Sequence, residues 1–155
     1  MGMIINPFWF GDAGPVGPII LGSALRAEKT STQNLLSSGK ILITFQQEVM
    51  DTDAAFASSV FTVPPGMDGN IAVIIAGCTR QISTDLDAYI DVDTGGGYVT
   101  KVRSDANDKR STQISTGPVL LNDGDLWRLS VDQSSATIAG TATDTPVFFS
   151  VMEIS

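Results

Sequence analysis

Apolar and polar side chains alternate along much of the chain from residue 41 onwards. Between residues 41 and 49 the odd positions Ile41, Ile43, Phe45 and Val49 are apolar, whereas positions 44, 46 and 48 are polar. An alternation of period two is typical of a β-strand that buries one face. The pattern therefore predicts a half-buried strand over residues 41–49.

A second alternating stretch, residues 85–93, is followed by Thr94 and three glycines and then by a third stretch at residues 98–103. Glycine adopts positive φ without a steric penalty, so a glycine-rich segment between two strands is typical of a hairpin turn. We therefore predict a β-hairpin over residues 85–103. Residues 122–125, with the sequence Asn-Asp-Gly-Asp, are a further turn signal between predicted strands at 119–121 and 126–131.

Two stretches, residues 71–78 and 147–154, are apolar at successive positions and so on both faces. Such runs are typical of the central strands of a sandwich. No apolar stripe of helical spacing has a useful length, and Pro64 and Pro65 would end any helix that precedes them. The chain, at 155 residues, has the length of one domain. The repeated short strands and turns predict an all-β fold, a β-sandwich or jelly roll.

The first 22 residues differ in kind from the rest, so we divide the chain into an arm at 1–22 and a head domain at 23–155. Gly11, Gly14 and Gly17 recur at a spacing of three, and a proline follows two of them. This is the Gly-X-Y pattern of polyproline II chains that pack in threes. It fits an extended arm or linker, and it also fits three arms that run parallel near a threefold axis.

The arm begins with a cluster of large apolar side chains. Because a cluster at a terminus cannot easily join a core that later strands build, its exposure to water favours association. Aromatic anchors of this kind are common hot spots of protein interfaces. We expect the cluster to bind a partner; the alternative is that it folds back on its own assembly. Its residues are Ile4, Ile5, Pro7, Phe8, Trp9 and Phe10.

The composition excludes several classes of function. The chain has no histidine and a single cysteine, Cys78, which rules out zinc sites of the Cys/His type and catalytic triads with a histidine base. We expect Cys78, inside an apolar run, to be a buried small hydrophobe. No enzymatic activity and no cofactor are expected.

Charge and hydropathy bear on the partners. The net charge of -8, without a basic stripe, disfavours binding to nucleic acid. No apolar run approaches the ~20 residues that span a bilayer, and the first residues lack the basic region of a secretory signal. Charged residues make up only 17% of the chain, below the ~25% of average domains, which we interpret as a sign of oligomerisation.

Four carboxylates share one face of the predicted strand at 85–93: Asp85, Asp87, Asp91 and Asp93. Carboxylate oxygens are the ligands that calcium prefers, so one interpretation is a calcium site. The other is a solvated outer face that discourages edge-to-edge aggregation. The second is favoured, because an extended strand spaces alternate side chains about 6.6–7 Å apart instead of gathering them around an ion.

Several short motifs follow one another in a characteristic order along the chain. Residues 61–64 read Phe-Thr-Val-Pro, and residues 121–131 read Leu-Asn-Asp-Gly-Asp-Leu-Trp-Arg-Leu-Ser-Val before a last apolar strand. This order resembles that of the tumour-necrosis-factor and complement-head superfamily. The resemblance covers residues 24–155 and implies a jelly roll that assembles as a homotrimer. On this interpretation we expect eight apolar positions to pack in the core or at the trimer interface: Phe45, Phe61, Ile71, Val73, Ile75, Trp127, Phe148 and Phe149.

The arm carries a second resemblance. Residues 3–10, Met-Ile-Ile-Asn-Pro-Phe-Trp-Phe, are similar to the short amino-terminal "Ile-Asn-Pro-aromatic" leader of small structural proteins of tailed bacteriophages. The resemblance implies a virion protein: a jelly-roll head held on the particle surface by its arm, as a capsid decoration, cement or head-fibre protein that binds the major capsid or another virion protein. The alternatives are a module that binds a host receptor or glycan, and a secreted relative of the complement head.

Overall fold

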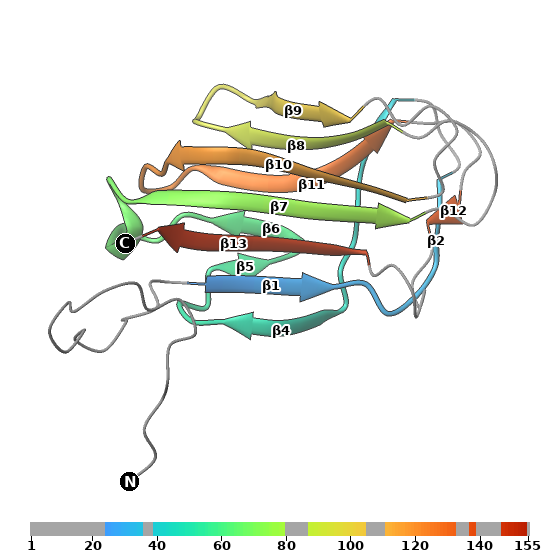
Figure 1. Ribbon diagram of the computed structural model, residues 1–155, viewed down its shortest axis with the longest axis horizontal. Coiled ribbons are helices and arrows are strands. Elements are labelled where there is room, and N and C mark those ends of the chain that lie inside the picture. Colours follow the sequence, from blue (N-terminus) through green and yellow to red (C-terminus); the bar gives the residue numbers. More distant parts are fainter. Residues whose placement is uncertain are drawn as a thin grey trace, which may run out of the picture.

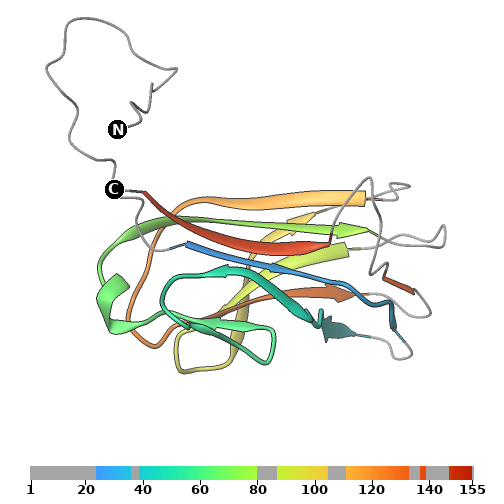
Figure 2. The same cartoon turned by 90° about the horizontal axis from the view of Figure 1, so that it is seen from below.

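The computed structural model describes residues 24–35, 39–79, 87–104, 111–132, 137–138 and 147–154. Two antiparallel sheets lie face to face, and Figure 2 shows them as two layers. The predicted all-β sandwich is confirmed. In the described part of the chain the helical structure is a 3₁₀ turn, Pro65–Met67, and no helix there is long and apolar enough to cross a membrane. The predicted arm, with its apolar cluster, lies outside the described residues.

The first sheet has the strand order β10-β7-β13-β1-β4 (Figure 1). Its strands, in that order, are Ser111–Leu120, Ile71–Thr79, Phe148–Ile154, Ala24–Glu28 and Gln47–Asp51. Both β7 and β13 have a hydrogen-bonded strand on each side. The two stretches predicted to be central strands are therefore central.

The second sheet has the strand order β5-β6-β11-β8-β9. Its strands, in that order, are Phe56–Ala57, Val60–Thr62, Leu126–Asp132, Asp87–Asp93 and Tyr98–Ser104. A further strand, β3 (Lys40–Leu42), pairs with residues 130–132 at the C-terminal end of β11. A small third sheet pairs β12 (Thr137–Ile138) with β2 (Gln33–Asn34).

The core fills the space between the two sheets. Trp127 of β11, Phe61 of β6 and Phe149 of β13 are among its largest fully buried side chains. Phe45 joins the layers, since its ring centroid lies 6.1 Å from that of Phe56 and 6.5 Å from that of Phe149. Each fully buried side chain of this size contributes about 1.5–3 kcal/mol relative to an exposed one. Aromatic packing across the layers therefore holds the sandwich together.

The predicted hairpin is confirmed as β8 and β9, which pair antiparallel. Gly95 and Gly97 in its turn have φ near +99° and +100°. The Asp93 carboxylate accepts hydrogen bonds of 2.8 Å from the backbone N–H groups of both glycines. The turn therefore needs glycine for its backbone angles and Asp93 to close it.

The single strand predicted over residues 41–49 is wrong. The structure divides this stretch into β3 and β4, which belong to opposite sheets. The Ile43 N–H still bonds to Leu129 of the second sheet, whereas the Gln46 N–H bonds to Glu28 of the first. The chain thus crosses the sandwich between these residues. Apolar alternation continues through the crossing because Ile43 and Phe45 both pack against the same core.

Three strands at sheet edges carry irregularities in register. The pairing of β4 with β1 skips Val49, the pairing of β9 with β8 skips Lys101, and the pairing of β10 with β7 is interrupted between Ser115 and Pro118. A bulge or a proline at an edge hinders the addition of another strand. The faces of the sandwich are therefore better suited than its edges to contact other chains.

Candidate functional site

The first sheet turns an apolar surface away from the core. Along β7, Ala72 and Ile74 are fully buried, whereas the side chains between them point outward, and Ile71 is 47% exposed. Neighbouring strands place further outward side chains beside these. Leu120 and Ile154 flank Ile71 in one row of the register, and Met152 lies beside Val73 in the next.

We call these five residues the apolar face: Ile71, Val73, Leu120, Met152 and Ile154. Leu120, Met152 and Ile154 are 59%, 44% and 50% exposed. Exposed large apolar side chains that stand singly are ordinary, but a continuous group across neighbouring strands marks an interaction surface. The apolar face is therefore the candidate contact surface of this sheet.

The other half of the same outward surface mixes paired polar groups with apolar side chains. Arg26 donates a hydrogen bond of 2.8 Å to Glu28, and its guanidinium lies 4.5 Å from the centroid of the Phe148 ring. The Ser150 hydroxyl donates to the carbonyl of Leu25 at 2.9 Å. These polar groups satisfy one another within one chain. Met50, opposite Arg26, adds an apolar side chain that is 49% exposed, so the larger group of exposed apolar side chains lies at the end that carries Ile71.

The eight positions expected in the core or at a trimer interface separate into two groups. Phe61, Trp127 and Phe149 are buried between the sheets, and Phe45 packs against them. The other four lie on the outward surface of the first sheet; Ile71 is exposed, and Val73, Ile75 and Phe148 are partly exposed. Sequence reasoning did not select Leu120, Met152 and Ile154, although the last two lie in a run that it recognised as apolar on both faces.

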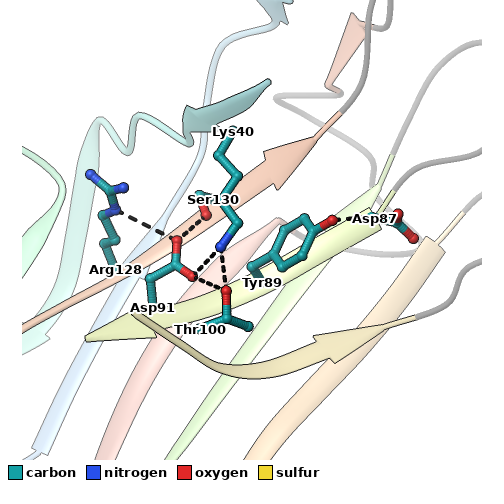
Figure 3. Close-up of polar contacts among 7 residues, drawn as sticks. All are labelled: Lys40, Asp87, Tyr89, Asp91, Thr100, Arg128 and Ser130. Carbon is teal, nitrogen blue, oxygen red and sulfur yellow. Dashed lines mark hydrogen bonds and ion pairs between the residues drawn. The ribbon is translucent and has the colours of Figure 1, made fainter. Parts of the chain in front are cut away.

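The acidic strand β8 forms a different kind of site. Asp91 is fully buried on the outward side of the second sheet, and it is the centre of a group of polar side chains (Figure 3). Lys40 reaches across from β3 and places its Nζ 2.9 Å from Asp91 Oδ1. Lys40 also bonds to the hydroxyl of Thr100. The expectation that this row of carboxylates is solvated is therefore wrong at Asp91, because Lys40 covers it.

Hydroxyl groups complete the environment of Asp91. Thr100 donates to Oδ1 at 2.9 Å, and Ser130 donates to Oδ2 at 2.5 Å. Burial by itself would raise the pKa of Asp91, but the hydrogen bonds from Lys40, Ser130 and Thr100 outweigh it and hold the pKa below its ordinary value. Asp91 is therefore ionised in the folded protein at neutral pH.

Two tyrosines lie beside this cluster under cationic side chains. Lys40 Nζ lies 4.3 Å from the centroid of the Tyr89 ring, and the Arg128 guanidinium lies 3.4 Å from that of Tyr98. Burial and the neighbouring Asp87 carboxylate raise the pKa of Tyr89. Both rings are thus engaged in cation–π contacts.

The carboxylates do not fit the calcium interpretation. Asp91 is bound to Lys40, Asp87 to Arg103 at 2.7 Å, and Asp93 to the N–H groups of the hairpin turn. A calcium site needs oxygen ligands that converge on one point, whereas two of these three already face cations. No group of three metal-binding side chains occurs within the described ranges, and Asp85 lies outside them.

A buried lysine lies on the first sheet's side of the core. Lys29 Nζ donates to the carbonyl of Thr44 at 2.8 Å, and burial lowers the pKa of Lys29. Burial also raises the pKa of Cys78 to about 12. A thiol with such a pKa is almost entirely protonated at neutral pH, so the expectation of an inert, buried Cys78 is confirmed.

The sequence matches no protein-family model and no curated protein sequence. Solved structures are similar to the chain in fold. Mouse APRIL superposes with a TM-score of 0.67 at 15% identity, over 85% of this chain and 98% of that one. The Eiger tumour necrosis factor of S. frugiperda gives a TM-score of 0.64 at 9% identity, over 86% of this chain and 92% of that one.

The globular domain of a zebrafish complement 1qA protein gives a TM-score of 0.52 at 13% identity, over 84% of this chain and 94% of that one. Identities this low establish the architecture and nothing finer. The chain therefore has the jelly-roll fold of the tumour-necrosis-factor and complement-head domains.

Proposed function

We propose that this chain is a non-enzymatic structural protein whose jelly-roll heads assemble as a homotrimer through the apolar face. The observation that carries the proposal is the exposure of Ile71, Leu120, Met152 and Ile154 in neighbouring rows of one sheet. Burial of such side chains stabilises an assembly by about 25 cal/mol for each Å² of apolar surface removed from water. Closed rotational symmetry is the usual way to bury one face on every copy.

The resemblance of the sequence to a trimeric superfamily selects three copies, and the shared fold supports it. The charge distribution agrees with this assembly. The ion pair on the outward surface of the first sheet, Arg26 with Glu28, is made within one chain, so these two charges do not oppose contact.

The finer proposal is a location on the virion surface of a tailed bacteriophage. The head would be a decoration, cement or head-fibre protein, and residues 1–22 would attach it to the major capsid or another virion protein. The leader-like sequence at residues 3–10 supports this proposal. Three arms on one trimer would add avidity, since binding of the first arm raises the effective concentration of the others.

The solution mass tests the assembly. We expect about 49 kDa by light scattering, three times the 16.3 kDa of one chain. Ile71→Glu places a charge in the apolar face and should yield monomers. Val99→Glu is the matched control, because Val99 is 63% exposed but lies on β9 of the other sheet. A wild-type monomer, or equal disruption by both variants, would refute assembly through this face.

Deletion of residues 2–10 tests the attachment. The truncated protein should remain a trimer in solution and should no longer sediment with virus particles. Retained binding to particles would show that the arm is not the anchor.

The alternative of a glycan-binding module has less support. Sugar rings commonly stack on bare aromatic faces, whereas Tyr89 and Tyr98, the two tyrosines of the chain, lie under Lys40 and Arg128. A glycan array that detects a strong ligand would restore this alternative.

A further inference from the structure

An ion pair borders the apolar face on the outward surface of the first sheet. Arg26 and Glu28 of β1 are two residues apart and so lie on the same side of the strand, and Arg26 Nε donates to Glu28 Oε1 at 2.8 Å. The row of Arg26 also holds Ser150 and Ile75. Met152 of the apolar face lies two residues along β13 from Ser150, a step of about 6.6–7 Å. The pair is therefore close to the surface that we propose to be buried between copies.

The other charged residues on the described strands of this sheet lie in rows whose side chains face the core. Their partners in register are buried alanine or leucine residues. The pairs are Asp51 with Leu25, Glu48 with Ala27, and Glu153 with Ala72. In the described part of the sheet, Arg26 and Glu28 are therefore the charges of the outward rows.

Apolar side chains continue on the far side of the ion pair. Met50 of β4 lies opposite Arg26 and is 49% exposed. Phe148 of β13 lies opposite Glu28 and is partly exposed. In Figure 1, β1 lies between β13 and β4. Without the two charges of β1, the apolar surface would extend from Leu120 on β10 across the sheet to Met50.

The ion pair is costly to bury in a contact. Removal of two charges from water is unfavourable unless new partners complete their hydrogen bonds. The side chains of Arg26 and Glu28 are 35% and 30% exposed, and the Phe148 ring holds the guanidinium at 4.5 Å from its centroid. Glu28 accepts the Nε–H of Arg26, whereas an apolar surface offers no acceptor for the other guanidinium donors.

We propose that the Arg26–Glu28 pair marks the border of the contact between copies and thereby fixes the register in which the trimer assembles. This inference rests on the proposed assembly through the apolar face. A contact that buries Ile71 and Met152 leaves the pair hydrated at its rim, whereas a copy displaced towards Met50 would bury the pair. A polar group at the edge of an apolar contact can thus select one arrangement among several.

The first test uses the full-length wild type with ¹³C-labelled methionine methyl groups and a soluble paramagnetic agent. We expect the Met152 methyl signal to be protected in the trimer, and the relaxation of the Met50 signal to be enhanced several times more. Met152→Leu and Met50→Leu assign the two signals. Equal protection of both methyl groups would overturn the proposal, because the contact would then extend across the ion pair.

The second test replaces the ion pair with apolar residues of similar length. In Arg26→Met with Glu28→Leu, copies should be able to slide, and the Met50 methyl group should become protected. Arg103→Met with Asp87→Leu is the matched control, because this pair of 2.7 Å lies on the second sheet. Arg26→Glu with Glu28→Arg keeps an ion pair at the same place. In both of these proteins Met50 should stay as accessible as in the wild type.

The outcomes separate this proposal from the assembly on which it rests. Light scattering that finds a monomeric wild type would refute the assembly itself. A trimeric wild type with a protected Met50, or an apolar double variant in which Met50 stays accessible, would overturn only the role of the ion pair. If the double variant does not fold, the wild-type measurement still decides.

Discussion

A single residue type has three different roles along β8. Asp87 pairs with the exposed Arg103, Asp93 closes the hairpin turn, and Asp91 is buried under Lys40. Their spacing in the sequence is regular, and spacing alone places them on one face. Asp91 differs from the other two in its burial because of β3: pairing of this strand with β11 places Lys40 where its side chain can reach Asp91. A residue 51 positions away in the sequence thus determines that Asp91 is buried.

Asp91→Asn should destabilise the fold by about 2 kcal/mol, because the buried carboxylate accepts charge-assisted hydrogen bonds from Lys40, Thr100 and Ser130 that an amide cannot fully replace. Urea unfolding at pH 7 measures this change. Asp87→Asn is the matched control: its partner Arg103 is 55% exposed, and loss of an exposed pair should cost less than about 1 kcal/mol. Equal effects of the two variants would contradict the structural role assigned to Asp91.

Comparison of the wild type with Asp91→Asn also gives a prediction for the pH dependence of stability. The pKa of Asp91 is lower in the folded state than its ordinary value of 3.8, so folding favours the ionised form. The stabilisation is fully present above pH 3.8 and is lost as the pH falls through the folded pKa. The difference in unfolding free energy between the wild type and Asp91→Asn should therefore be constant from pH 5 to 7 and shrink below about pH 4.

Among the elements, the edge strand β10 shows how a bulge is built. Gly117 has φ of +65°, and the Thr116 hydroxyl accepts the Ile74 N–H at 3.1 Å. A side-chain oxygen thus satisfies a donor of β7 where the strand ladder is interrupted. Pro118, which has no N–H of its own, follows directly. The edge that results is poorly suited to pair with another strand.

Gly117→Ala should cost about 1 kcal/mol of stability, because an L-residue is strained at this φ. A Cβ at Gly117 would meet no atom within 4 Å, so the cost comes from the backbone alone. Gly66→Ala is the control, since that site is equally open and its φ is not in the left-handed region. Chemical unfolding should show a change within about 0.5 kcal/mol for Gly66→Ala. A Gly117→Ala variant as stable as the wild type would argue against the bulge.

Across the whole molecule, the outward surfaces of the two sheets have different chemistry. The first sheet carries the apolar face, and the second carries the Lys40, Asp91 and Arg128 cluster. A trimer that buries the first surface would leave the second available to other proteins.

If the head is a trimer, its unfolding must depend on concentration, since assembly stabilises the folded chains by mass action. A tenfold rise in protein concentration should raise the thermal midpoint by about 2–4 °C. The midpoint of Ile71→Glu should not change with concentration. A wild-type midpoint that is independent of concentration over a hundredfold range would contradict the proposed assembly.

Local pattern by itself predicted the all-β class, the hairpin with its glycine turn, and the two central strands. These features depend on residues close together in the sequence: alternation at 85–93, glycines at 95–97, and apolar runs at 71–78 and 147–154. The motif order at 61–64 and 121–131 also indicated the fold that the solved structures share.

Only the tertiary structure decided which apolar residues form the core and which face outward. Ile71 and Phe149 both lie in apolar runs and on neighbouring strands of one sheet. Their register distinguishes them, because Phe149 pairs with the buried Ala76 whereas Ile71 pairs with the exposed Ile154. The tertiary structure also decided that the chain crosses from the second sheet to the first between Ile43 and Gln46, and that Asp91 is buried. The physical reason is the same in each case: packing against strands that are distant in the sequence determines whether a side chain meets water, the core or an opposite charge.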